Sequence, residues 1–153
     1  MRPQLIVDKN EKSQICSFIL RSLPNWFGIE SAIIDYVDAV REFRMWASYN
    51  ENQVIGFISV QMHNPSSMEV HVMGVLENFH NRKIGSSLLN AAVQNLKIEN
   101  VEYLQVKTLS EKHPDMHYAK TRKFYEKMGF VPVQEFSLLW GKDNPCVQMI
   151  LKI

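Results

Sequence analysis

Two side chains that can transfer protons lie close together in the middle of the chain. Glu69 and His71 are two residues apart within 68–75, a run of strand-forming residues. Because side chains alternate along a strand, we expect Glu69 and His71 to share one face with Met73 and Val75. A carboxylate or an imidazole there can accept a proton from a substrate. The alternative is a half-exposed strand whose polar side chains only face water.

A second group of residues is suited to binding an anion. Apolar residues at helical spacing predict a helix over 82–100, whose first backbone N–H groups would form a positive end. Arg82 and Lys83 add positive charge there, which is unfavourable for the helix dipole unless an anion binds. Gly85 would let a ligand approach the backbone closely. Alternatively, Arg82 and Lys83 are simply solvated.

The rest of the pattern predicts the elements that would position these groups. Strands are expected at 5–7, 43–49, 54–62, 68–75, 101–108, 131–139 and 147–153, and helices at 10–23, 30–40, 82–100 and 118–128. Asn10 is expected to cap the first helix, and Gly129 to end the last one in a left-handed conformation. The order βααβββαβαββ predicts an α/β fold, a mixed sheet of about seven strands with helices on both faces. No repeat or linker divides residues 1–153, so we expect a single domain.

This order resembles that of the GNAT family of N-acetyltransferases, and two motifs carry the likeness. Residues 80–85, His-Asn-Arg-Lys-Ile-Gly, are similar to the acetyl-CoA loop of the family, [Q/R]-x-x-G-x-[G/A]. His80 and Lys83 occupy two of its three fixed positions. The run 124–130, Phe-Tyr-Glu-Lys-Met-Gly-Phe, is similar to the F-Y-E-K-x-G-F helix end of the family. The resemblance implies an acyltransferase that moves an acetyl group from acetyl-CoA directly to an amine within a ternary complex.

The resemblance also assigns roles to residues. Tyr125 would protonate the departing thiolate, although a packed core tyrosine is the alternative. Glu69, His71 or water would take the proton of the amine. The residues implied to contact acetyl-CoA lie on the strand, the loop and the two helices that the motifs span; they are Met73, Gly74, Val75, His80, Arg82, Lys83, Ile84, Gly85, Ser86 and Phe124.

The acceptor side is less defined. Trp26 and Phe27 lie between the first two helices, in the segment that commonly borders the acceptor in this family. They would form either an apolar lid or plugs for the edge of the core. The acceptor could be a protein N-terminus, a lysine, a polyamine, an aminoglycoside or another metabolite. Because His80 and Lys83 replace family residues, a CoA-binding module without turnover, serving as a sensor or partner subunit, is the second functional hypothesis.

Composition narrows the class of protein. The net charge is +1, 46% of the residues are hydrophobic and 22% are charged, so no strong field would attract nucleic acid or an anionic membrane. No apolar run approaches the ~20 residues that span a bilayer. We therefore expect a cytoplasmic monomer or homodimer without nucleic-acid, membrane or metal partners. Cys16 and Cys146 are far apart, and we expect reduced, partly buried thiols.

Overall fold

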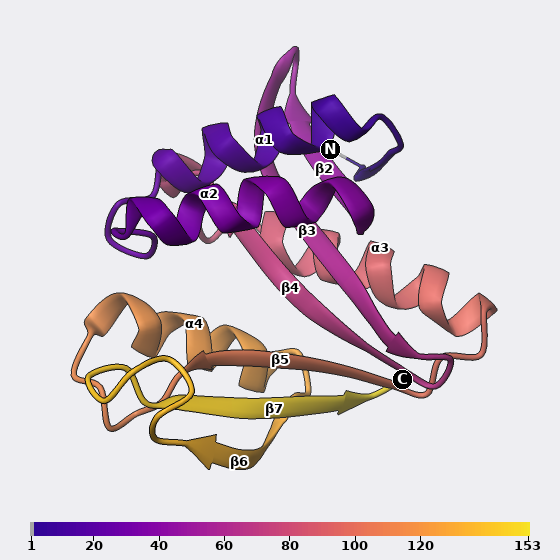
Figure 1. The fold of residues 1–153 in the computed structure, drawn as a ribbon. Coiled ribbons are helices and arrows are strands. Elements are labelled where there is room, and N and C mark those ends of the chain that lie inside the picture. Colours follow the sequence, from indigo (N-terminus) through magenta and orange to yellow (C-terminus); the bar gives the residue numbers. More distant parts are fainter. Residues whose placement is uncertain (1) are drawn as a thin grey trace.

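The computed structural model describes residues 2–153 and contains one seven-stranded sheet in the order β1-β2-β3-β4-β5-β7-β6 (Figure 1). Neighbouring strands are antiparallel except β4 and β5, which are parallel. The strands are β1 (Gln4–Ile6), β2 (Arg44–Asn50), β3 (Gln53–Asn64), β4 (Ser67–Val75), β5 (Tyr103–Leu109), β6 (Val131–Phe136) and β7 (Cys146–Lys152). The helices are α1 (Lys9–Arg21), α2 (Glu30–Ala39), α3 (Ile84–Ile98) and α4 (Met116–Lys127). The predicted α/β class and element order are confirmed.

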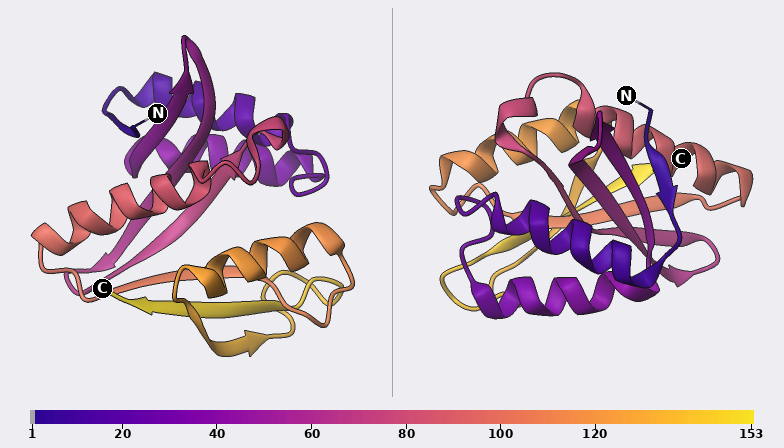
Figure 2. Two further views of the ribbon diagram at one scale, coloured as in Figure 1. Left: turned by 180° about the vertical axis from the view of Figure 1, so that it is seen from behind. Right: turned by 90° about the horizontal axis from the view of Figure 1, so that it is seen from above.

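Helices cover both faces of the sheet, as predicted. α1 and α2 lie on one face, and α3 and α4 lie on the other (Figures 1 and 2). Ile19 and Leu20 of α1 are fully buried in the first core, and Leu88 and Leu89 of α3 are fully buried in the second. Burying such a side chain contributes about 1.5–3 kcal/mol, so the two cores fix the helices against the sheet.

Some boundaries differ from the sequence predictions. Asp8, not Asn10, caps α1, and its carboxylate accepts a hydrogen bond from the N–H of Glu11 at 2.8 Å. The strand predicted over 131–139 ends at Phe136, after which the chain forms turns whose side chains are exposed over 137–143. Gly129 has φ +99°, which confirms the left-handed end of α4.

The cysteines agree with the expectation from the sequence. Cys16 and Cys146 are both buried and unbonded. Burial raises the pKa of the Cys16 thiol to about 12, so that thiol stays protonated at neutral pH. Across residues 2–153, no helix combines the length and the apolar content that crossing a membrane requires.

Candidate active site

β4 and β5 separate in the middle of the sheet. Their parallel pairing runs from Ser67 and Tyr103 to Val70 and Val106, where it stops. Beyond this point β4 pairs with β3 alone and β5 pairs with β7 alone, and the two strands spread apart (Figure 1). We call this region, 71–75 of β4 and 107–109 of β5, the β4–β5 divergence. Because the ladder is interrupted there, groups from both faces of the sheet can meet.

A β-bulge begins the divergence on β4. Val60 pairs with Val70 and Ser59 pairs with Val72, so His71 is an extra residue without a partner on β3. The sequence prediction that Glu69, His71, Met73 and Val75 share one face is therefore wrong for Met73 and Val75. The ring of His71 contacts Tyr36 of α2, whereas Met73 and Val75 pack into the core on the α3 face. An extra residue shifts the alternation of side chains by one position, which sequence periodicity cannot reveal.

Three of the predicted cofactor residues meet on the α3 face. A Cβ at Gly85 would lie 3.3 Å from Cε1 of Phe124 and 3.9 Å from Cε of Met73. Gly85 therefore leaves room for the Phe124 ring of α4 against the first turn of α3, a reason beyond the ligand approach that we expected. Gly74 faces the other way, where a Cβ would lie 2.9 Å from Cγ2 of Ile19. The side chains of Met73 and Phe124 and the backbone of Gly85 thus lie together beside the divergence.

The start of α3 has the features of an anion site. Lys83 is the N-cap residue in a left-handed conformation (φ 62°), and it makes no side-chain cap. The first turn contains no acidic residue. Arg82 and Lys83 are exposed, whereas the side chain of Ile84 is buried in the core, so only its backbone could face a ligand. Ser86 donates from Oγ to the carbonyl of Lys83 at 3.1 Å. An uncapped helix end beside two cations suits a phosphate group.

Tyr125 of α4 lies among aromatic side chains of the α3-side core. Its side chain is only 5% exposed and packs against Phe124 and Phe130. Burial raises the pKa of the Tyr125 phenol, and the nearby phenols of Tyr118 and Tyr36 raise it further. Tyr125 is therefore protonated at neutral pH, as a proton donor must be, while its packing also fits the core role that the sequence left open.

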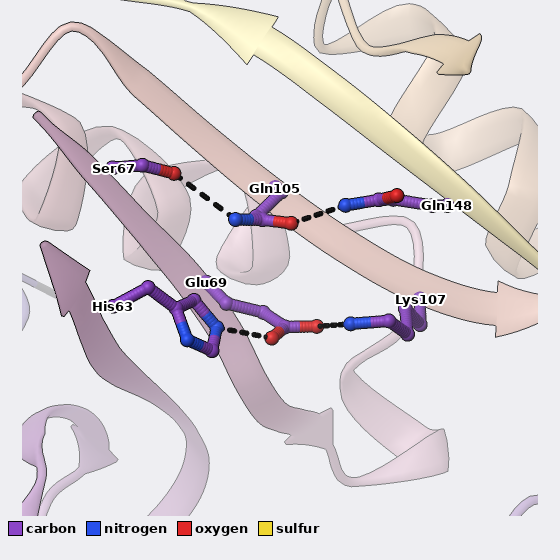
Figure 3. Close-up of polar contacts among 6 residues, drawn as sticks. All are labelled: His63, Ser67, Glu69, Gln105, Lys107 and Gln148. Carbon is purple, nitrogen blue, oxygen red and sulfur yellow. Dashed lines mark hydrogen bonds and ion pairs between the residues drawn. The ribbon is translucent and has the colours of Figure 1, made fainter. Parts of the chain in front are cut away.

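Glu69 belongs to a three-residue network on the sheet face opposite α3 (Figure 3). Nζ of Lys107 on β5 donates to Oε2 of Glu69 at 2.9 Å, and Nε2 of His63 on β3 lies 2.6 Å from Oε1. The Glu69 side chain is 12% exposed. Both carboxylate oxygens therefore already have a partner, so Glu69 is an organised acceptor and not a free surface carboxylate.

His71 is placed differently from Glu69. Its ring lies between the rings of Tyr36 and Phe43, with centroids 5.3 and 4.8 Å away, and Nε2 is buried without a hydrogen-bond partner. Burial lowers the pKa of His71, and the Glu69 carboxylate offsets part of this effect. His71 is thus neutral at pH 7, as a base must be. Its Nε2 is nevertheless buried away from solvent among aromatic rings.

Trp26 connects the two sides of the divergence. Its ring packs edge-on against His80, which precedes α3, and against His117 of α4. The hydroxyl of Tyr118 donates to the carbonyl of Trp26 at 2.6 Å. Phe27 instead packs against Tyr36 of α2. Both aromatic residues are half-buried at the rim, a position compatible with either a lid or a plug.

The sequence predictions did not include three residues of this region. Lys107 lies on the opposite face of β5 from the core residues Leu104 and Val106. The alternation of side chains along a strand could have predicted this placement. His63 is an extra residue of β3 without a partner on β4, and Tyr36 lies on α2. Nothing in the sequence around either residue indicates that it reaches this region. Within residues 2–153, no cluster of three or more His, Cys, Asp or Glu side chains is arranged to hold a metal.

Comparisons with known proteins agree with this architecture. A family model described as "Acetyltransferase (GNAT) domain" matches residues 41–132. A GNAT-family acetyltransferase structure from Desulfovibrio desulfuricans superposes with a TM-score of 0.81 at 13% identity, over 99% of this chain and 96% of that one. Aminoglycoside 6'-N-acetyltransferase from Enterococcus faecium gives 0.75 at 20% identity, over 99% and 97%. A GNAT-family acetyltransferase from Elizabethkingia anophelis with acetyl-CoA bound gives 0.66 at 17%, over 86% and 88%.

A search of curated protein sequences found no match. The solved structures share too little identity to establish more than the fold. The family model, however, spans more than half of the chain, from within the 3₁₀ turn Val40–Glu42 before β2 to the start of β6. It therefore contains β4, α3, β5 and α4. This chain belongs to the GNAT acetyltransferase family.

Proposed function

We propose that this protein is an N-acetyltransferase that transfers an acetyl group from acetyl-CoA directly to an amine while both are bound. The observation that carries the proposal is the β4–β5 divergence, where Met73 of β4 and Gly85 at the uncapped start of α3 lie beside Phe124, whose ring packs against that of Tyr125. Structural neighbours crystallised with coenzyme A or acetyl-CoA support it.

Acetyl-CoA would be held mainly by backbone groups. The main chain at Met73, Gly74 and Val75 has no β5 partner and would bond to the pantetheine arm as an added strand does. The N–H groups of the first turn of α3 would bind the phosphates, with Arg82 and Lys83 adding positive charge. When bound, the cofactor supplies an activated acetyl thioester.

The side chains of this site would carry out two proton transfers, one from the amine and one to the thiolate. A lysine-like amine has a pKa of ~10.4, so deprotonating it at pH 7 costs about 4–5 kcal/mol. Glu69 would accept that proton, and His63, whose side chain is 38% exposed, would pass it from 2.6 Å away toward solvent. The protonated phenol of Tyr125 would donate to the departing thiolate.

The test is to incubate the wild-type protein with acetyl-CoA and a broad amine panel, and to measure free thiol and acetylated product. Calorimetric titration of CoA reports binding independently of turnover. We expect CoA binding and thiol release that depends on an amine. Binding of CoA without thiol release for any amine would contradict an enzymatic function.

That second outcome would support a CoA-binding module without turnover, and one contact favours this function. Nε2 of His80 lies 2.7 Å from the carbonyl oxygen of Val75, which belongs to the β4 edge proposed for pantetheine. While this contact lasts, that main-chain acceptor is occupied. If the contact persists when CoA binds, the ligand would be held differently from the way proposed for catalysis.

A further inference from the structure

A polar surface lies where α1 and α2 leave the sheet uncovered. Within the described residues 2–153, no helix lies in front of β5, β7 and β6 on the face that α1 and α2 occupy (Figure 1). Gln105 and Lys107 of β5 and Gln148 of β7 occupy this face, because they alternate with residues of the α3-side core. Figure 3 shows the resulting rows of polar contacts across β3, β4, β5 and β7. We call Ser67, Glu69, Gln105, Lys107, Gln148 and His63 the polar face.

The charges of the polar face are balanced. Its carboxylate, Glu69, is paired with the ammonium of Lys107 at 2.9 Å. The two side chains are 12% and 25% exposed, so solvent screens them less than a surface pair. Beside them, the amide of Gln105 donates to Ser67 Oγ at 3.0 Å and its oxygen accepts from Gln148. A polycation approaching Glu69 would therefore meet the like charge of Lys107.

A zwitterion avoids this conflict. Its ammonium would bind the Glu69 carboxylate, and its carboxylate would bind the Lys107 ammonium, so that each buried charge keeps an opposite partner. An amine without an anionic group would compete with Lys107 for Glu69 and leave a buried cation with less compensation. The neighbouring amides offer further donors and acceptors for a small polar molecule.

We infer that the acceptor is a primary amine that also carries a carboxylate, as a free amino acid does. Lys107 recognises the carboxylate and Glu69 the amine. This inference rests on the proposed acetyl transfer, and it deepens that function by naming a class of acceptor.

Matched acceptors test the inference on the wild-type protein. Each amino acid is compared with its decarboxylated amine and with its amide: phenylalanine with phenethylamine and phenylalaninamide, and leucine with 3-methylbutylamine and leucinamide. The amides control for the basicity of the amine. Like the decarboxylated amines they lack the negative charge, but their amine is less basic, so the two analogues separate an effect of charge from an effect of basicity. We expect kcat/KM for the amino acids to exceed both analogues by roughly ten- to a hundredfold, as for a charged hydrogen bond.

Lys107 variants locate the preference. Lys107→Met should abolish it, and Lys107→Arg should retain most of it. Lys112→Met removes the same charge from the more exposed Lys112–Glu135 pair, where the lysine is 71% exposed, and should leave the preference unchanged. Thermal melting identifies any variant that does not fold, in which case the Lys107→Arg and wild-type results decide.

The outcomes separate this inference from the proposed function. Turnover with equal or higher kcat/KM for the decarboxylated amines, or a preference that survives in folded Lys107→Met, would overturn the inference and leave acetyl transfer standing. No turnover with any acceptor would overturn acetyl transfer itself, and this inference with it.

Discussion

The two halves of β4 lie in different surroundings although they form one strand. Residues 67–70 pair with β3 on one side and β5 on the other, and Met68 and Val70 are buried in the α3-side core. Residues 72–75 pair with β3 alone. The transition occurs at His71, the bulged residue. The comparison shows that one additional residue can end a ladder, redirect the following side chains and open a strand edge.

This difference predicts that substitutions in the two halves have different effects. Changes in the α3-side core of the paired half, where Leu104 lies opposite Met68, should lower stability and leave the chemistry of the folded protein intact. Glu69, on the other face of this half, belongs instead to the proposed site. Changes around the divergent half should affect ligand binding and turnover more than stability.

The largest effect should come from removing the Tyr125 hydroxyl. Tyr125→Phe keeps the aromatic packing with Phe124 and Phe130 but removes the proposed proton donor. We expect kcat to fall about 10²–10⁴-fold, the range for general acid catalysis, with CoA affinity retained. Thiol release under saturating substrates measures this.

Tyr103→Phe is the matched control, because Tyr103 lies at the paired end of β5 and is 37% exposed. Turnover by Tyr125→Phe equal to that of Tyr103→Phe would assign Tyr125 a packing role only.

A core substitution beside the paired half should have the opposite profile. Leu104 of β5 is fully buried opposite Met68. Leu104→Ala should lower the free energy of unfolding by about 2–5 kcal/mol, because it leaves a cavity. Urea denaturation gives this value, and kcat per folded molecule should stay near wild type. A large loss of kcat in the folded variant would contradict the prediction that core changes beside the paired half affect stability alone.

Charge reversal at the start of α3 should have a smaller, selective effect. Lys83→Glu places a negative charge where the phosphates of CoA would bind. We expect CoA binding to weaken roughly two- to fivefold, as for an exposed charge at a helix end. Pantetheine, which lacks the nucleotide phosphates, should bind as before. Equal losses for the two ligands in calorimetric titrations would separate Lys83 from the phosphate site.

The smallest effect is a dependence of stability on pH that arises from His71. Burial holds its pKa below the ordinary value of ~6.5, so the unfolded chain binds the proton more readily than the folded one. The contribution of His71 to the free energy of unfolding is therefore fully present above about pH 6.5. This free energy decreases as the pH falls from there toward the pKa of His71 in the folded protein. Urea titrations between pH 7.5 and 5 on wild type and His71→Gln measure it. An unchanged acid-side slope in His71→Gln would refute this origin.

The sequence predicted the scaffold better than the site. Hydrophobic periodicity depends on local spacing, so the order of strands and helices and the core residues of α3, such as Leu88, were found. The bulge at His71 depends on the register with β3, a non-local property, so the faces assigned to Met73 and Val75 were wrong. Asp8 and Asn10 are both good capping residues, and local sequence did not separate them.

Site residues joined by long-range contacts were the hardest to predict. Lys107 reaches Glu69 from 38 residues away, and the pairing is specified only once β4 and β5 lie in register. The motif residues Gly85 and Phe124 were identified from local sequence, but their mutual packing followed from the way α3 and α4 meet. The roles assigned to Tyr125, Glu69 and His71 in catalysis remain predictions.

The position of Trp26 has a practical consequence for measuring these events. Its indole touches His80 and His117, which belong to segments on either side of the divergence. Of the three tryptophans in the chain, Trp46 is buried in the core and Trp140 lies in the turns after β6. A ligand that moves either histidine would alter the fluorescence of Trp26, so emission spectra of a variant that keeps only this tryptophan would report occupancy without a label.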